Sequence, residues 1–280
     1  MTETLARPQA PWALRLLPPF PAVATRIMAL AASEDTDLNE LGKVVKTDPS
    51  FSAELLRVAN SALFGVRREV TSVAHAISIV GTDRVKSMAT LVAVNRMIRA
   101  SVRIQALRKV WMHSLVTAAI AEEAARVAGM DRENAYTAGL LHNLGTLGMM
   151  SAYPDEYSRM LEVSDDYGFD LLQTERDLFE IDHCAAGAYL AQDWDFPEEL
   201  AAVIATHHDD LVPGEISIYN LVKASWRLAD VLGYAAFSPE KQWQWEELIA
   251  YFPNVRSSWL GESLEASQEE LANRLASAPL

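Results

Sequence analysis

Apolar residues recur along this chain at steps of three and four, and alternation of period two is almost absent. The steps from Val23 to Ile27 and Leu30 place one apolar stripe along a helix. Asp48 and Pro49 together indicate a helix start, because proline fits the first turn, where its missing N–H costs nothing. The pattern therefore predicts an all-α protein.

The longest predicted helix runs from Leu107 to Ala128 and ends at Gly129. Asp131 then caps a helix that runs toward His142. Further helices are expected over 82–97, 154–166, 168–180, 182–193, 198–208 and 216–232. An aromatic group near the C-terminus is expected to pack against the rest of the chain; it comprises Trp243, Trp245, Phe252 and Trp259.

The composition is that of a folded globular protein, with 280 residues, 50% hydrophobic and 22% charged. Its one cysteine, Cys184, excludes a disulfide within the chain and gives secretion no support. No apolar run approaches the roughly 20 residues of a membrane span. The first residues also lack the basic-then-apolar layout of a signal peptide. These features together predict a cytoplasmic protein that makes no membrane contact.

The net charge of −14 is unevenly distributed. Residues 1–130 hold 16 Lys and Arg against 11 Asp and Glu, whereas residues 131–280 hold 8 against 27. Such an acidic chain is a poor nucleic-acid binder, because phosphates need neutralising cations. One segment is locally basic and includes Arg84, Lys86, Arg96, Arg99 and Arg103. It is either a solvated face that complements the acidic half, or a docking surface for an acidic partner or a nucleotide.

Five of the six histidines form a series, namely His113, His142, His183, His207 and His208. His113 shares a helical face with Val110, Thr117 and Ile120, and His183 shares one with Leu190, Ala191 and Trp194. Histidines on buried faces of several helices can converge on a metal ion, and Asp230 is a plausible carboxylate partner. Alternatively, such histidines bond to one another or to carbonyl groups. Adjacent residues on a helix diverge by about 100°, so His207 and His208 need not enter one site.

Several segments in order resemble the motifs of HDOD domains, which are relatives of the HD phosphohydrolases. The first four are LPPFP at 17–21, DPSF at 48–51, LLRVANSA at 55–62 and AISIVG at 76–81. WMHS at 111–114 and AGLLHNLG at 138–145 resemble the part shared with HD hydrolases. His183, Gly187, Leu190, Trp194, Pro197 and the His207–His208 pair complete the pattern.

The resemblance implies a helical bundle of HD-like type with an additional N-terminal helical part and a C-terminal helical tail. Its expected divisions are an extension over 1–16, an HDOD domain over 17–213 and C-terminal helices over 214–280 packed on it. Within the domain, 17–100 is the N-terminal helical part and 101–213 is the HD-like part. The resemblance also implies a stand-alone protein of bacterial signalling, whose partners are other signalling proteins.

In metal-dependent HD hydrolases, a His-Asp pair holds the metal at the position of residues 142 and 143. This chain has Asn143 in place of the Asp, and Thr146 where the HD-GYP phosphodiesterases have Lys. Asn is neutral and cannot bridge two metals, so it should weaken metal binding and raise the pKa of bound water. The candidate ligands of a divalent Fe, Mn, Zn or Mg ion are His113, His142, Asn143, His183, His207, His208 and Asp230.

Three functions follow from this pattern. The first is a regulatory protein that acts by binding a protein or a ligand through a degenerate HD site, without catalysis. The second is a metal-dependent phosphohydrolase or phosphodiesterase. The third is a sensor that binds a nucleotide or a metal in the former active site without turnover.

Overall fold

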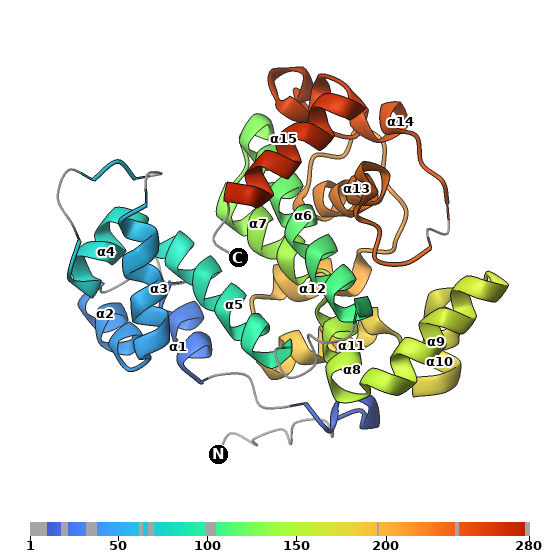
Figure 1. Ribbon diagram of the computed structural model, residues 1–280, viewed down its shortest axis with the longest axis horizontal. Coiled ribbons are helices and arrows are strands. Elements are labelled where there is room, and N and C mark those ends of the chain that lie inside the picture. The colour runs from blue at the N-terminus through green and yellow to red at the C-terminus, as the bar shows by residue number, and fades with distance from the viewer. Residues whose placement is uncertain are drawn as a thin grey trace, which may run out of the picture. The chain divides into compact units, whose positions relative to one another are not determined.

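The computed structural model describes residues 10–17, 22–31, 38–61, 64–66, 70–98, 105–194, 196–238 and 241–277. Across these ranges the regular elements are all helical and no strand occurs (Figure 1), which confirms the all-α class. The chain divides into two compact units, one of Met1–Pro18 with Ile98–Leu271 and one of Pro19–Met97 with Ala272–Leu280. We call them the larger and the smaller unit. No described helix is both long and apolar enough to cross a membrane.

The smaller unit packs its helices around an aliphatic core. These helices are α1 (Ala22–Ala31), α2 (Leu38–Lys46), α3 (Pro49–Ala59), α4 (Val73–Val80) and α5 (Thr82–Ile98), whose last residue belongs to the larger unit. Leu41, Leu55 and Ile77 are completely buried in that core. The predicted start of α3 is confirmed, since the Asp48 side chain accepts a hydrogen bond from the backbone N–H of Phe51 at 3.0 Å.

The larger unit begins with the short helix η1 (Trp12–Leu14) and continues from α6 to the C-terminal elements. Its helices are α6 (Gln105–Ala128), α7 (Arg132–Leu141), α8 (Leu144–Ala152), α9 (Pro154–Tyr167), α10 (Leu171–Phe179), α11 (His183–Asp193), α12 (Glu198–Thr206) and α13 (Ile218–Ala229). The short segments η2 (Asp230–Tyr234), α14 (Trp245–Ile249), η3 (Val255–Ser257) and η4 (Trp259–Gly261) precede α15 (Leu264–Ser277), whose residues from Ala272 onward belong to the smaller unit. Of the C-terminal aromatic residues, Phe252 is buried and the three tryptophans are half-buried.

Helix α6 lies at the centre of the larger unit and packs against both α7 and α13. Its predicted end is confirmed, because the chain leaves the helix at Gly129 with a positive φ of 72° that glycine adopts without strain. The predicted cap of α7 is also confirmed, since the Asp131 side chain accepts from the Asn134 N–H at 3.0 Å. The resulting face of α6 carries His113 into the core beside Val110 and Thr117.

Two glycines bring α8 and α11 into backbone contact. A methyl group at Gly145 would overlap the carbonyl oxygen of His183, and one at Gly187 would lie 3.0 Å from the backbone nitrogen of Gly145. Only residues without a side chain allow so close an approach. This contact places the first residue of α11 directly beside the junction of α7 and α8.

Candidate metal centre

The seven candidate ligands predicted from the sequence all lie in the larger unit, and six of them lie near the ends of its helices. His142 and Asn143 join α7 to α8, His183 begins α11, His207 and His208 follow α12, and Asp230 follows α13, while His113 lies within α6. The five histidine rings lie next to one another. Their centroids are 5.3 Å apart for His113–His142, 5.2 Å for His142–His207, 5.3 Å for His183–His207 and 4.6 Å for His207–His208. The structure therefore brings the whole series into one cluster.

Four of the five rings in this histidine cluster are buried, and His208 is half-buried. His113, His142, His183 and His207 are each no more than 3% exposed. Burial, reinforced by the neighbouring His113, lowers the pKa of His142 well below its usual value. Burial likewise lowers the pKa of His207, and it lowers that of His208 to about 2. These three rings are therefore neutral and can offer a lone pair.

Hydrogen bonds show which nitrogen carries the lone pair. Nδ1 lies 2.6 Å from the Gly139 carbonyl oxygen in His142 and 2.7 Å from the Ile204 carbonyl oxygen in His207. Since a carbonyl only accepts, each Nδ1 bears the hydrogen and each Nε2 bears the lone pair. The buried Nε2 of His142 has no hydrogen-bond partner among the described residues.

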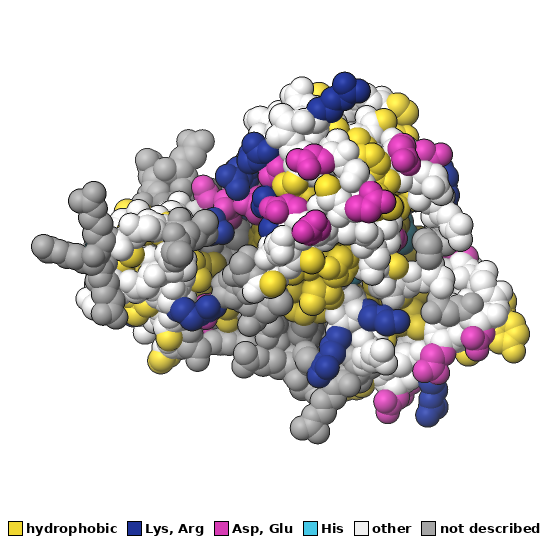
Figure 2. Space-filling model, turned by 45° about the horizontal axis from the view of Figure 1, so that its top comes forward, with side chains coloured by type: hydrophobic (Ala, Val, Ile, Leu, Met, Phe, Trp, Pro, Cys, Tyr) yellow, Lys and Arg dark blue, Asp and Glu magenta, His cyan; other side chains and the backbone are white. Residues whose placement is uncertain are grey.

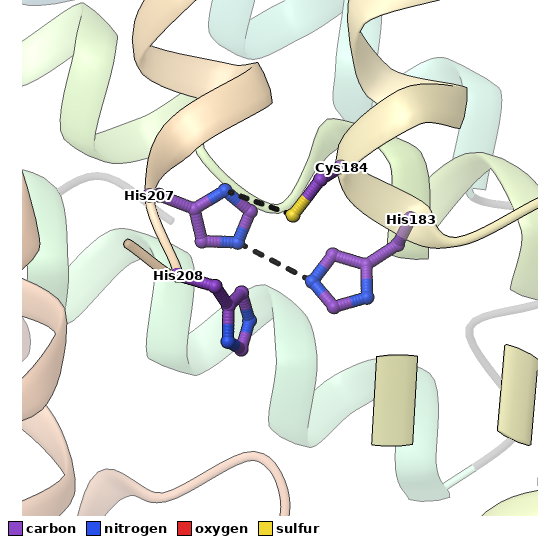
Figure 3. Close-up of side chains that lie close together, drawn as sticks. All are labelled: His183, Cys184, His207 and His208. Atoms are coloured by element: carbon purple, nitrogen blue, oxygen red, sulfur yellow. Dashed lines mark hydrogen bonds between the residues drawn. The ribbon is translucent and has the colours of Figure 1, made fainter. Parts of the chain in front are cut away.

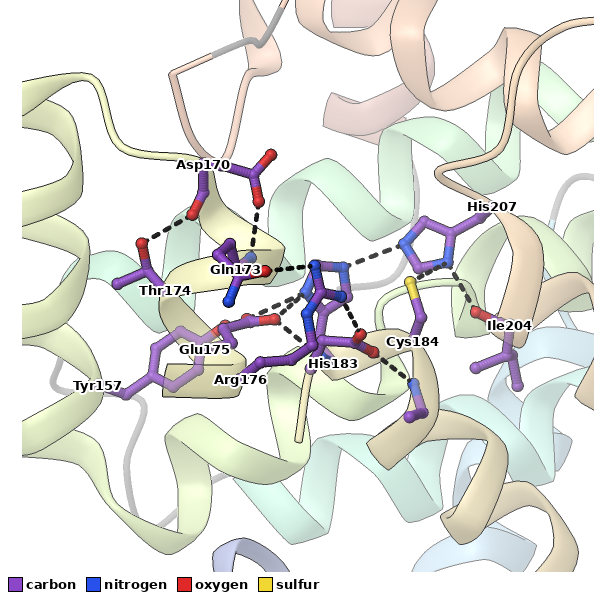
Figure 4. Close-up of polar contacts among 12 residues, drawn as sticks. Tyr157, Asp170, Gln173, Thr174, Glu175, Arg176, His183, Cys184, Ile204 and His207 are labelled. Atoms are coloured by element: carbon purple, nitrogen blue, oxygen red, sulfur yellow. Dashed lines mark hydrogen bonds and ion pairs between the residues drawn. The ribbon is translucent and has the colours of Figure 1, made fainter. Parts of the chain in front are cut away.

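His183 differs from the other rings because a buried carboxylate holds it. Its Nδ1 lies 2.8 and 3.0 Å from the two carboxylate oxygens of Glu175, and its backbone N–H donates to the same carboxylate at 2.8 Å. Burial alone would lower the pKa of His183, but Glu175 offsets that effect and raises it well above its usual value. With Nδ1–H donated to Glu175, the second nitrogen, Nε2, faces the cluster (Figure 4).

The Nε2 atoms of His183 and His207 face each other at 3.3 Å (Figure 3). Because the pKa of His183 is raised, its Nε2 bears a hydrogen and donates to the lone pair of His207; a metal ion bound here would take the place of that hydrogen. Two nitrogens bound to one tetrahedral zinc ion at about 2.0–2.1 Å stand about 3.4 Å apart. The observed separation therefore fits a shared metal.

The donor set around this pair narrows the choice of ion. Ligand atoms of His183, Cys184, His207 and His208 all lie within 4.8 Å of one another. The thiol of Cys184 lies 3.9 Å from Nδ1 of His207, on the side of the ring that bonds to Ile204. Imidazole and thiol donors suit Zn or Fe better than Mg, which prefers oxygen ligands.

His113 connects Asn143 to Asp230 through one hydrogen bond on each side of its ring, beside this donor set. Nε2 of His113 lies 3.0 Å from a carboxylate oxygen of Asp230, and Nδ1 of His113 lies 3.2 Å from the amide nitrogen of Asn143. The carboxylate accepts from Nε2–H, so Nδ1 bears the lone pair and accepts from the amide. An ionised aspartate at position 143 has no hydrogen to donate. The Asn143 amide thus gives Nδ1 of His113 a hydrogen-bond donor from within the protein.

Glu175 and Tyr157 support the cluster, although the sequence reasoning did not single them out. The Tyr157 hydroxyl donates to the carboxylate of Glu175, and both side chains are completely buried (Figure 4). A signal for Glu175 exists in the sequence. The residue lies midway between Leu171 and Phe179 at steps of four, so a carboxylate interrupts an otherwise apolar stripe.

Trp226 and Arg227 on α13 fix the backbone of the His207–His208 segment. The indole N–H of Trp226 donates to the His207 carbonyl oxygen at 2.8 Å. The guanidinium of Arg227 donates to the carbonyls of His208 and Asp209 at 3.2 and 3.1 Å, and lies over the Trp226 ring. Arg227 thus uses its guanidinium to bind backbone carbonyl groups rather than a phosphate.

Of the basic residues predicted as ligand or partner contacts, the structure describes the side chains of Arg84 and Lys86. Arg84 and Lys86 are half-exposed on α5 in the smaller unit, and the Arg84 guanidinium lies 5.8 Å from the centre of the Phe64 ring. The side chain of Arg96, and Arg99 and Arg103 as a whole, fall outside the described residues. Nucleotide binding by this segment stays a prediction.

A helical bundle that gathers histidines from α6 and from the ends of α7, α11 and α12 defines a protein of the HD-like class. Comparison with protein families identifies the particular branch. The HDOD domain model matches residues 17–210, and the chain therefore belongs to the HDOD family.

Similar proteins support this assignment. An uncharacterised protein of Treponema pallidum (strain Nichols) is 25% identical over 195 residues, which cover 69% of this chain and 38% of that protein. A protein of Marinobacter aquaeolei VT8, provisionally described as a signal transduction protein, has 25% identity and a TM-score of 0.64 over 93% of this chain and 57% of its own. This chain thus spans well under two thirds of the length of either protein.

Two further solved structures share the fold. An HDOD domain protein of unknown function from Geobacter sulfurreducens is 23% identical, with a TM-score of 0.64 over 93% of this chain and 89% of its own. A provisionally described phosphohydrolase from Shewanella amazonensis SB2B is 23% identical, with a TM-score of 0.65 over 92% and 90% of the two chains. At this identity the likeness establishes the architecture alone.

Proposed function

We propose that this HDOD protein is a regulatory protein that holds a divalent transition metal at His183, His207 and His208 and does not hydrolyse phosphate esters. The HDOD family and the signalling relative support a general regulatory or HD-like role. The observation that carries the non-catalytic part is the bond from the Asn143 amide to Nδ1 of His113. It occupies the side chains that an HD hydrolase would offer to its catalytic metal.

Burial of the cluster supports the same proposal. Hydrolysis requires a metal-bound water that faces the phosphate of a substrate. Of the three proposed ligands, His183 and His207 are at most 1% exposed and His208 is half-buried, so a phosphate ester could approach the ion only on the side of His208. When bound, the metal supplies a cross-link between the start of α11 and the end of α12. Glu175 holds His183 in the orientation that such a ligand needs, as outer-shell carboxylates do in metalloproteins.

Metal content tests the binding part of the proposal. Untagged protein is purified without chelator and analysed by mass spectrometry for Zn, Fe and Mn, beside His183→Ala, His207→Ala and the control His75→Ala. His75 is the sixth histidine and lies exposed on α4, so its loss should leave the metal content unchanged. We expect stoichiometric metal in the wild type and in the control, and its loss in the other two variants. Equal content in all four proteins would contradict the assignment.

Turnover tests the non-catalytic part. Metal-loaded protein is incubated with cyclic dinucleotides, nucleotides and a chromogenic phosphodiester, and hydrolysis is compared with that of His142→Ala. We expect no hydrolysis above the level of that variant. Turnover that disappears in His142→Ala would instead establish the phosphohydrolase alternative.

A further inference from the structure

A second site lies on the surface of the larger unit, in a groove between η1, α9 and α10. The groove has a volume of about 500 Å³, and its walls include Trp12, Met160, Val163, Leu178 and Phe179. The rings of Trp12 and Phe179 stack at 5.6 Å and form an aromatic floor. The metal proposal uses none of these residues.

Large hydrophobic side chains stand exposed around this groove. Val163 is 47% exposed and Leu178 56%, and both line the groove. Tyr167 is 72% and Phe169 55% exposed, and their rings stack on each other at the tip of the same helical hairpin. Contiguous exposed apolar groups of this kind mark interaction sites more often than ordinary surface.

The same hairpin is strongly acidic. Residues 154–182 hold ten Asp and Glu against two Arg and no Lys, a formal charge of −8 in a chain whose net charge is −14. Exposed carboxylates on this segment are those of Asp155, Glu156, Glu162, Asp166, Asp170, Asp177 and Glu180. Figure 2 shows acidic and hydrophobic side chains, with basic ones beside them, on the part of the larger unit where Figure 1 labels α9 and α10.

We infer that this α9–α10 surface docks a basic amphipathic helix of a partner protein. Apolar side chains at helical spacing would enter the groove over Trp12 and Phe179, and flanking Lys or Arg would meet the carboxylates. Net charge selects this occupant: Glu156 and Arg159 both line the groove, but the hairpin as a whole has a formal charge of −8, so a second copy of the same surface, or a nucleic acid, would bring negative charge to negative charge. A basic amphipathic helix can bury its apolar face in the groove and pair its Lys or Arg side chains with the carboxylates.

The test uses a fluorescein-labelled helical peptide with Leu at positions i, i+3, i+4 and i+7 and Lys elsewhere. Its anisotropy is followed during titration with the full chain, with Val163→Asp, with Leu178→Asp and with the control Val212→Asp. Val212 has the same 47% exposure as Val163 but lies outside the groove. We expect the groove variants to bind at least about tenfold more weakly, because each places a carboxylate against the apolar face of the peptide. The control should bind as the wild type does.

A matched peptide with Glu in place of Lys should not bind, and added salt should weaken binding of the Lys peptide. Circular dichroism and thermal unfolding establish that each variant is folded; substitutions at sites about half exposed should leave both unchanged. Absence of saturable binding to the wild type would overturn the inference. So would equal affinity of the wild type and both groove variants, which would mean a general attraction to acidic protein.

Discussion

Substitution of Glu175 by alanine removes the carboxylate that three buried donors share. Nδ1–H and the backbone N–H of His183 lose an acceptor at 2.8 Å each, and the Tyr157 hydroxyl loses its partner. Each buried donor left without a partner costs about 1–3 kcal/mol, and a broken buried ion pair about 3–5 kcal/mol. Because the three losses share one group and do not add, we expect unfolding to be easier by about 4 kcal/mol.

Urea unfolding followed by circular dichroism measures this change on chelator-treated protein. Glu175→Gln keeps the shape and one acceptor, so it should cost about 1–2 kcal/mol and weaken metal binding by about 10–100-fold. Asp177→Asn, an exposed position on the same helix, serves as the control and should shift stability by less than about 0.5 kcal/mol. Equal unfolding midpoints for Glu175→Ala and the wild type would refute the account of His183 given above.

Three other predictions follow from the cluster. Gly145→Ala should destabilise the fold by about 3 kcal/mol or more in urea unfolding, since its methyl group overlaps the His183 carbonyl oxygen; full stability would contradict the backbone contact. Asn143→Asp should cost about 1–3 kcal/mol without metal, because His113 loses a donor, and added Mn²⁺ should restore part of it; unchanged stability without metal would count against the bond. The three histidines with lowered pKa (His142, His207 and His208) stay neutral in the fold but bind protons in the unfolded chain. Metal-free protein should therefore lose stability as pH falls below about 6.5, by up to about 4 kcal/mol per pH unit. His183 acts in the opposite sense, because its raised pKa gives a stabilising contribution that is fully present below about pH 6.5 and is lost as pH rises above that value. A flat pH profile from 7 to 5 would refute the neutral assignments.

The periodicity of apolar residues was sufficient to predict most helices of the larger unit. Helix α6 begins two residues before its predicted start and ends where Gly129 indicated, and the inward face that carries His113 is the predicted one. These features depend on local chemistry: a stripe at helical spacing, a capping carboxylate and a glycine at positive φ. They are therefore readable from one segment of chain at a time.

Contacts between residues far apart in the chain could not be predicted from local sequence in the same way. Whether both His207 and His208 enter one site was open, because adjacent helical residues diverge; the structure resolves this by ending α12 at Thr206, so that neither lies inside the helix. Glu175 was missed because most glutamates on short amphipathic helices are solvated, and its burial depends on the positions of α9 and α11. The apolar stripe that Glu175 interrupts indicated a buried carboxylate, but it did not predict which side chains would bond to it.

Helix α10 has two faces with different surroundings. One face presents Glu175 to His183, and the other presents Thr174 and Leu178 to the groove, within nine residues of continuous helix. A helix this short moves as one body, so a shift of its outer face also shifts the carboxylate on its inner face. By thermodynamic reciprocity, a helix bound outside and an ion bound inside would change each other's affinity by the same factor. Such a coupling would make the affinity of the surface for its partner depend on whether the largely buried histidine cluster holds a metal ion.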